Sequence, residues 1–256
     1  MLLVIDAGNT NVTLGVFRGT DLVAQSRLST DQDRGSDEYG VEMHNSFARS
    51  GINPKEIEAV IIASVVPPLN EKLKRIAELD FNLTPLFVDH NTDTGLKVLY
   101  ESPAELGADR IVDAVAAVAK YGAPCIVVDF GTATTFNAVN EASEYLGGVI
   151  APGLMISAEA LFSRAAKLPR VDIKRPAKVI GTSTIGAMQS GLYHGYAGLV
   201  DGVLAQMIAE MNSKPRVVAT GGLASLIANA SKFIEAVDAT LTLDGLRIIY
   251  ERNQTR

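Results

Sequence analysis

Short apolar runs that end at a polar turn are the first regular pattern in this chain. Residues 2–5 are apolar and end at Asp6, and the turn 7–11 separates them from the β-rich run 12–17. A strand, a glycine-containing turn and a second strand predict a β-hairpin. The pattern returns about half a chain later, where an apolar run ends at Asp129 and the turn 130–135 follows.

The spacing of the two hairpins predicts two structurally similar halves, because it is too long for a solenoid repeat. Apolar side chains at helical spacing predict a helix over 110–120, and we place the boundary there, with halves 1–114 and 115–256. Alternating apolar and polar segments predict an α/β class. The expected strands are 57–66, 86–88 and 216–220, the expected helical segments are 70–77, 155–166 and 183–211, and the polar stretch 30–40 is an expected loop.

Composition favours a globular protein that acts on small molecules or on protein partners. Hydrophobic residues make up 47% of the chain and charged residues 20%, and the net charge of -6 gives no basic surface for nucleic acid. The single cysteine, Cys125, lies in an apolar run and is expected in the core, which fits a reducing compartment. We find no apolar stretch of the ~18 residues that a membrane span needs, and we expect a cytoplasmic protein.

Each predicted hairpin turn combines a carboxylate with hydroxyls, amides and a glycine that lets a ligand approach the backbone. Phosphate is a natural ligand for such a turn, and the aspartate would then act through a cation. The alternative is a hairpin turn stabilised by its own side chains, although two copies in equivalent positions favour a ligand. The sequence contains neither a P-loop nor a dinucleotide-binding glycine motif.

The two Asp-x-Gly hairpins, together with the strand that ends at Thr220, Gly221 and Gly222, resemble the acetate kinase, sugar kinase, heat-shock-70 and actin superfamily. This resemblance implies two duplicated ribonuclease-H-like (actin-like ATPase) domains that face each other across a nucleotide cleft. It also implies that the first turn meets the phosphates, that the second faces it, and that the two glycines lie near the adenosine. An ordinary strand-to-helix turn is the alternative for the two glycines.

Two further segments carry candidate chemistry. In the segment 107–110, Asp109 could accept a proton from a hydroxyl nucleophile, and Arg110 offers hydrogen-bond donors to a carboxylate or phosphate. The alternative is that Asp109 caps the following helix. In the segment 181–191, Thr184 is expected to cap the helix that begins there. We assign no chemistry to the three histidines, His44, His90 and His194, because none has metal-ligand spacing.

Taken together and in order, the two hairpins, the Gly-Ala-Asp-Arg segment and the Thr-x-x-Ala-Met-Gln-Ser-Gly segment are similar to type III pantothenate kinases over essentially the whole chain. The resemblance implies ATP-dependent phosphorylation of pantothenate to 4'-phosphopantothenate, the first step of coenzyme A biosynthesis. It also implies a cytoplasmic homodimer that needs Mg²⁺ and a monovalent cation, K⁺ or NH₄⁺. Ser183 departs from the asparagine that the family often has at this position.

The resemblance also implies roles for individual residues. Asp109 is the expected proton acceptor, Asp129 the expected monovalent-cation ligand, and Asp6 the expected contact to Mg²⁺ through phosphates or water. The expected ATP contacts are Asp6, Ala7, Gly8, Asn9, Thr10, Asn11, Val12, Thr13 and Thr132. The expected pantothenate contacts are Tyr100, Gly107, Ala108, Asp109, Arg110 and Thr184, the last in its own subunit or across the dimer interface. Phosphorylation of another small alcohol, a phosphatase, and a nucleotide-binding regulatory protein without turnover are the alternatives.

Overall fold

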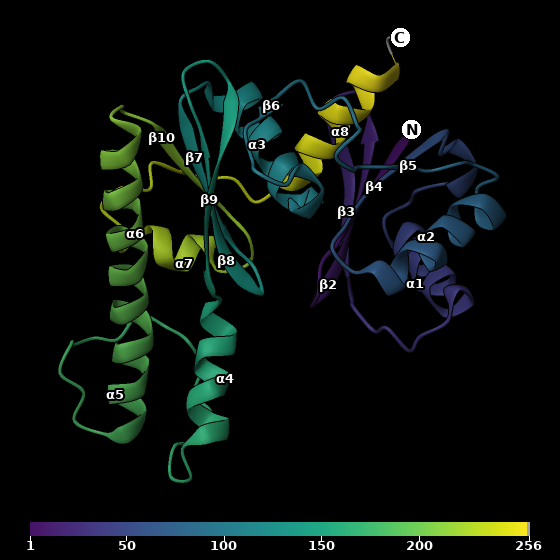
Figure 1. The fold of residues 1–256 in the computed structure, drawn as a ribbon. Helices are drawn as coiled ribbons and strands as arrows, with labels where there is room; N and C mark the ends of the chain where they lie inside the picture. The colour runs from purple at the N-terminus through teal and green to yellow at the C-terminus, as the bar shows by residue number, and fades with distance from the viewer. Residues whose placement is uncertain (255–256) are drawn as a thin grey trace. The chain divides into compact units, whose positions relative to one another are not determined.

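Two compact units make up the described part of the chain, residues 1–254, in the computed structural model (Figure 1). Unit 1 contains Met1–Leu96, Tyr100–Ala116 and the C-terminal segment from Leu241. Unit 2 contains Lys97–Leu99 and Ala117–Thr240. Each unit has its own sheet and its own helices, which confirms the predicted α/β class.

Unit 1 is built on a five-stranded sheet with the order β3-β2-β1-β4-β5. The first three strands form an antiparallel meander, and β1, β4 and β5 run parallel. Their bounds are β1 Leu2–Ala7, β2 Asn11–Arg18, β3 Asp21–Ser29, β4 Ala59–Ser64 and β5 Leu86–Phe87. The helices of this unit are α1 Ser36–Arg49, α2 Pro67–Asp80, the first part of α3 Ala108–Tyr121, and α8 Leu241–Gln254, with short 3₁₀ turns at Pro54–Glu56 and Pro103–Glu105.

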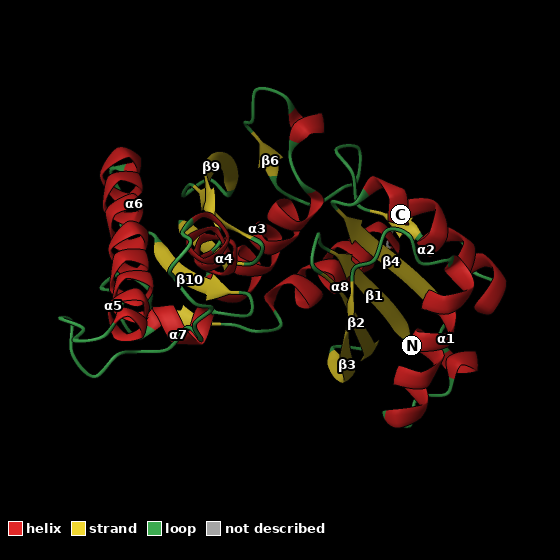
Figure 2. Ribbon diagram, turned by 90° about the horizontal axis from the view of Figure 1, so that it is seen from below, coloured by secondary structure: helices red, strands yellow, loops and turns green. Residues whose placement is uncertain are grey.

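Helices cover both faces of the unit 1 sheet (Figure 2). On one face, Leu3 and Ile5 of β1 share a buried cluster with Tyr39 of α1 and Leu69 of α2. On the other face, β1 and β4 contact α8. A central strand that is buried on both faces needs apolar side chains at every position. This requirement explains why the run 2–5 is continuously apolar.

Unit 2 repeats the same strand order. Its sheet has the order β11-β10-β7-β8-β9-β6. Read from β9 to β11, five of these strands correspond one for one to β3, β2, β1, β4 and β5 of unit 1. The bounds are β6 Lys97–Val98, β7 Cys125–Phe130, β8 Ala133–Val139, β9 Glu144–Pro152, β10 Arg216–Thr220 and β11 Ala236–Val237. The predicted duplication of the two halves is therefore visible in the topology.

The helices of unit 2 pack mainly through a cluster that includes Ile126, Phe136, Tyr193 and Val200. The predicted helical segment 183–211 is one continuous rod in Figure 1, made of α5 Thr184–Ser190, the π-helical turn Gly191–Gly195 and α6 Tyr196–Met211. The other helices are α4 Leu154–Arg164, α7 Ala224–Ala228 and the last turn of α3. Cys125 is fully buried, as expected, and burial raises the pKa of its thiol to about 12.

The two units differ from the predicted halves 1–114 and 115–256 in two respects, the first being that Lys97–Leu99 groups with unit 2. The change of unit after Ala116 lies inside α3, close to the predicted position, but α8 groups with unit 1. The cause is burial, because Leu243, Leu246 and Ile249 of α8 are almost inaccessible to solvent. A division made along the sequence does not capture the return of the chain to the first sheet.

The predicted loop 30–40 is wrong for its second half, where α1 begins at Ser36. The helix start is fixed by Glu38, whose carboxylate accepts a hydrogen bond of 2.8 Å from the backbone amide of Gly35. This contact satisfies one of the amides that a helix start leaves without an intrahelical partner. Among residues 1–254, no helix is long and apolar enough to cross a bilayer.

Close contact between α8 and α3 yields a test of the unit 1 packing. A methyl group on Gly245 would lie 2.2 Å from the carbonyl oxygen of Val112. Alanine normally stabilises the interior of a helix relative to glycine by roughly 0.5–1 kcal/mol, whereas forced overpacking costs about 1–3 kcal/mol. We therefore expect Gly245→Ala to lower the thermal unfolding midpoint by several degrees. A raised midpoint would contradict the packing of α8 on α3.

Candidate functional site

The turn between β1 and β2 carries the predicted phosphate-binding residues of unit 1. The Gly8 amide donates to the Asn11 carbonyl over 2.9 Å, which closes the turn, and Asn9 and Thr10 at its tip are exposed. Thr30, which the sequence pattern did not single out, donates its hydroxyl to the Gly8 carbonyl over 2.6 Å. The turn is thus accessible to a ligand and is fixed by a residue from outside the hairpin.

Asp109 lies at the same edge of the sheet as this turn. Strand β4 runs parallel to β1, and the Val65 amide just after β4 donates to the carbonyl of Ala7 over 3.1 Å. A methyl group on Gly107 would lie 3.5 Å from the Val65 side chain and 2.6 Å from Oδ1 of Asp109. Parallel strands bring their carboxyl ends to one edge, and ligand sites in α/β proteins favour that edge. Unit 1 therefore gathers the predicted base and the predicted ATP turn along one edge.

The carboxyl group of Asp109 is partly buried at the start of α3. Burial raises its pKa above the ordinary value of 3.8, and this effect outweighs the hydrogen bond from the Arg110 amide and the charge of Arg110, which act in the opposite direction. The amide bond to Oδ1 is 2.8 Å long. A raised pKa moves a carboxylate towards the range in which a general base is effective.

The alternative role for Asp109 as the helix cap is wrong. Helix α3 begins at Ala108, so Asp109 is already its second residue. The carbonyl of Gly107 accepts the amides of Arg110 and Ile111, which makes Gly107 the residue at the start of the helical hydrogen bonds. Gly107 also has no side chain, which leaves room for the Asp109 carboxyl.

Arg110 brings Tyr100 into the same group. Arg110 is 6% exposed, and its guanidinium carbon lies 5.9 Å from the centre of the Tyr100 ring. A cation over an aromatic face is stabilised by the charge distribution of the ring. Tyr100 and the segment 107–110, separate in the sequence, therefore form one cluster beside the candidate base.

The second hairpin, in unit 2, holds Asp129 against two glycines. A methyl group on Gly221, which has a φ of +91°, would lie 2.4 Å from Oδ1 of Asp129, and one on Gly131 would lie 3.1 Å from Oδ2. The carboxylate is thus enclosed by backbone that only glycine allows to come so close. One carboxylate among backbone groups is a suitable donor set for a weakly bound monovalent cation.

No cluster of protein ligands for a divalent ion was found in the part of the chain that the structure describes: no three His, Cys, Asp or Glu side chains are grouped. Mg²⁺ in kinases is commonly held by one or two carboxylates together with substrate phosphates. A single carboxylate such as Asp6 at the end of β1 fits that arrangement. His44 lies elsewhere, since it pairs with Asp80 at 3.2 Å on the surface of α1 and α2.

Thr132, on the turn that follows Asp129, is exposed. A methyl group on Gly153 would lie 2.0 Å from the carbonyl oxygen of Thr132, so the start of α4 packs directly on this turn. The neighbouring Thr134 is buried and shares a 2.5 Å hydrogen bond with the hydroxyl of Tyr196. Tyr196 also donates to the carbonyl of Pro152 over 2.9 Å, and it was not recognised in the sequence.

Thr184 is exposed at the first position of α5, and the expectation that it caps this helix is wrong. Ser183 is the cap, because its hydroxyl accepts the Gly186 amide over 3.1 Å. Serine and asparagine are both good N-cap residues. The departure at Ser183 from the family's common asparagine therefore keeps the local structure and leaves the Thr184 hydroxyl available to a ligand.

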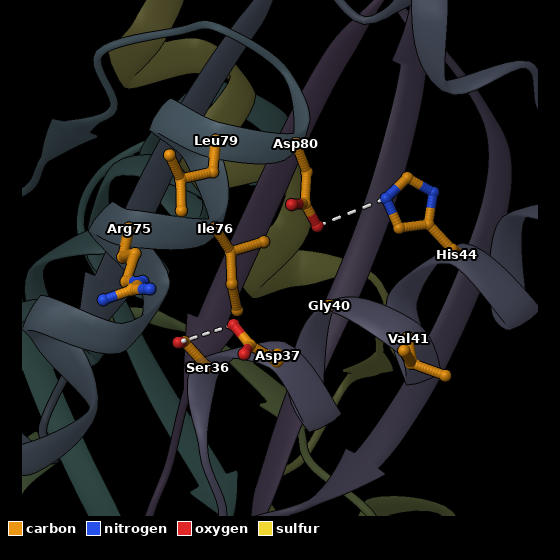
Figure 3. Close-up of a pocket in the computed structure, with 9 residues that line it drawn as sticks. All are labelled: Ser36, Asp37, Gly40, Val41, His44, Arg75, Ile76, Leu79 and Asp80. Atoms are coloured by element: carbon orange, nitrogen blue, oxygen red, sulfur yellow. Dashed lines mark hydrogen bonds and ion pairs between the residues drawn. The ribbon is translucent and has the colours of Figure 1, made fainter.

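A surface hollow of about 290 Å³ lies between α1 and α2 (Figure 3). Its walls include Asp37, His44, Arg75 and Asp80. No residue of the predicted site lines it. It therefore plays no part in the candidate chemistry.

Solved structures of low sequence identity share the fold of this chain. The ROK hexokinase of Thermus thermophilus aligns with a TM-score of 0.51 at 14% identity and covers 100% of this chain and 99% of its own. Component A of (R)-2-hydroxyglutaryl-CoA dehydratase from Acidaminococcus fermentans aligns with a TM-score of 0.56 at 15% identity over 100% and 99% of the two chains. This chain therefore shares the fold of these proteins, and the repeated strand order of its two sheets agrees with the expected duplicated ribonuclease-H-like architecture.

Sequence comparison identifies the family of this chain. A family model described as type III pantothenate kinase matches residues 2–206. The type III pantothenate kinase of Koribacter versatilis is 56% identical, over 100% of this chain and 97% of its own length. The chain belongs to the type III pantothenate kinase family.

Because Asp109 is partly buried, removing its charge is expected to stabilise the fold. A folded-state pKa above the unfolded one means that ionisation destabilises the fold as pH rises through that interval. We expect Asp109→Asn to raise the thermal unfolding midpoint at neutral pH, with a gain that shrinks as pH falls towards the ordinary aspartate range. Glu105→Gln, at an exposed acid in the preceding turn, serves as control and should change little. A less stable Asp109→Asn variant at pH 7 would show that the charge is favourable.

Proposed function

We propose that this protein transfers the γ-phosphoryl group of ATP to the primary hydroxyl of pantothenate, giving 4'-phosphopantothenate and ADP in the first step of coenzyme A biosynthesis. The observation that carries the proposal is Asp109, a partly buried carboxylate of raised pKa that lies beside Arg110 at the sheet edge of the Asp6 turn. Family membership supplies the substrate class.

In the proposed reaction, Asp109 accepts the proton of the attacking hydroxyl as the oxygen forms its bond to the γ-phosphorus and ADP leaves. Phosphoryl transfer depends mainly on positioning and on neutralising negative charge. Arg110 supplies a fixed positive charge to the carboxylate of pantothenate or to a phosphate. Tyr100, Gly107 and Ala108 complete the proposed pantothenate contacts, together with the hydroxyl of Thr184 from the same subunit or from the second subunit of a dimer.

The ATP contacts in this proposal are residues 6–13 and Thr132. The exposed tip of the first turn offers backbone amides and the side chains of Asn9, Thr10 and Asn11. These groups can donate to phosphate oxygens without a lysine-containing P-loop. Thr132 offers a hydroxyl at the equivalent turn of unit 2.

Two cations belong to the proposal. Mg²⁺, when bound, would neutralise charge on the phosphate oxygens, and Asp6 would contact it through phosphates or water. Asp129, enclosed by Gly131 and Gly221, would hold K⁺ or NH₄⁺. The roles of Asp6 and Asp129 thus differ although their positions in the two sheets are equivalent.

We further propose a homodimer that works in the cytoplasm, where ATP is available. Unit 2 exposes large apolar side chains on α4, on the segment that leads into α5 and on α5 itself, among them Met155, Ile156, Leu161, Val179, Ile180 and Ile185. Contact with a second subunit would remove these side chains from water. Because Thr184 adjoins Ile185, a dimer formed through this surface would bring Thr184 to the interface between the two subunits.

Three other activities fit the same fold. Fold alone does not separate kinases for different alcohols, phosphatases and nucleotide-binding regulators. The cluster of Tyr100, Asp109 and Arg110 favours a reaction with a hydroxyl acceptor over simple nucleotide binding. A panel of small alcohols in an ADP-release assay separates these possibilities.

Replacing the proposed base should abolish most turnover. We expect Asp109→Asn to lower kcat for pantothenate by about 10²–10⁴, the usual contribution of a positioned base, with the KM for ATP little changed. The measurement is coupled ADP release with the purified variant, and Glu105→Gln is the control. Turnover near the wild-type rate would reject Asp109 as the proton acceptor.

Cation dependence should follow Asp129. We expect exchange of K⁺ for Na⁺ to raise the KM for ATP in the wild type, because the smaller ion fits a site built for the larger one less well. Asp129→Asn should remove most of this difference, since the carboxylate that holds the ion is lost. Kinetics that are independent of the monovalent cation in the wild type would refute the role of Asp129.

A further inference from the structure

The residue that follows β3 holds the ATP turn at two points. Strand β3 pairs antiparallel with β2, with Ser29 opposite Asn11, so the chain leaves the sheet directly beside the turn. The Thr30 amide donates to the carbonyl of Thr10 over 3.0 Å. The Thr30 hydroxyl donates to the carbonyl of Gly8 over 2.6 Å. One residue from outside the hairpin therefore binds both ends of the exposed tip.

The residues that follow Thr30 are held by two helices of the same unit. The hydroxyl of Tyr39, a fully buried residue of α1, accepts the Asp31 amide over 2.7 Å and lies 3.1 Å from the Asp31 carbonyl. The Nζ atom of Lys72 on α2 donates to the carbonyls of Gln32 and Arg34 over 2.6 and 2.7 Å. The segment 30–34 is thus an ordered support between the helices and the turn.

We propose that Thr30 is a positioning residue for ATP: its two hydrogen bonds fix the Gly8 and Thr10 carbonyls and so orient the amides of the turn towards the phosphates. The inference rests on the proposed role of residues 6–13 in ATP binding. Glycine allows many backbone conformations, and a turn that must be ordered on binding loses affinity. Holding the two carbonyls in advance removes part of that entropic cost.

Two substitutions of Thr30 distinguish the effect of its hydroxyl group from the effect of its side-chain shape. Thr30→Val keeps the branched side chain and removes the donor to Gly8, whereas Thr30→Ser keeps the donor. A hydrogen bond of this kind contributes about 0.5–1.5 kcal/mol, so we expect the Kd of Mg²⁺-ATP for Thr30→Val to rise up to about tenfold. We expect Thr30→Ser to bind ATP nearly as well as the wild type, and the KM for pantothenate to stay unchanged in both.

The matched control is Thr92→Val. Thr92 lies in the same unit, and its hydroxyl also donates to a backbone carbonyl, that of Phe87, over 3.3 Å. The substitution makes the same chemical change after β5, which lies two strands from β1 in the sheet. We expect no change in the Kd of ATP. Binding is measured by calorimetric titration of Mg²⁺-ATP into the full chain, with thermal unfolding recorded for each variant.

A second pair of variants tests the contacts that hold the segment 30–34. These variants keep the proposal testable even if Thr30→Val does not fold. Lys72→Met removes the donor to the Gln32 and Arg34 carbonyls and keeps the length of the side chain. Lys74→Met changes another lysine of α2, one that is 4.0 Å from Glu78. We expect Lys72→Met to raise the Kd of ATP about two- to fivefold, and Lys74→Met to leave it unchanged.

Unchanged ATP affinity in folded Thr30→Val or in Lys72→Met, or equal losses in Thr30→Val and Thr30→Ser, would overturn the proposal. Because ATP is titrated without pantothenate, the role of Thr30 is tested independently of whether the protein phosphorylates pantothenate. If the wild type binds ATP but does not phosphorylate pantothenate, the proposed substrate fails and the role of Thr30 is still decided by the titration. If the wild type does not bind ATP, both fail.

Discussion

Partial burial of one carboxylate is the constraint on which the candidate site depends. Asp109 must be shielded enough for its pKa to rise and open enough to meet a hydroxyl group. Helix α3 meets both requirements at its first turn, where Gly107 leaves space for the carboxyl and the Val65 side chain lies close by. The Arg110 amide and charge limit the shift in the opposite direction. The packing that surrounds this turn is therefore part of the chemistry.

The sheet of unit 1 explains why these groups meet. Strands β1 and β4 are parallel neighbours, so the Asp6 turn and the loop after β4 emerge at one edge. The hydrogen bond between Val65 and Ala7 ties these two connections together, and Asp109 lies against the second. Unit 2 has the same strand order, but its Asp129 is enclosed by glycines and no residue like Asp109 is proposed for it. In the proposed function, the equivalent turns of the two units therefore have different roles.

Local sequence signals predicted much of this arrangement, because hairpins and central strands are determined by short apolar runs and turn residues. The two hairpins, the helix 110–120 and the burial of Cys125 follow from such signals. The packing of α8 on unit 1 could not be predicted in this way, since it depends on contacts between residues far apart in the sequence, such as Gly245 and Val112. The start of α1 was predicted as a loop because the segment is polar, and the contact of Glu38 with Gly35 that fixes the helix start is visible only in the structure. Thr30 had no sequence signal, as its role arises only where β3 ends beside the turn.

The pH dependence of kcat/KM for pantothenate tests the central claim most directly, because it reports the ionisation of the base in the free enzyme. A base must be deprotonated, so activity should fall as pH decreases through the pKa of Asp109. The account predicts an acid limb with a midpoint above the ordinary aspartate value of 3.8, since burial raises that pKa. A rate that stays constant down to the pH at which the protein unfolds, or a midpoint at or below 3.8, would contradict it.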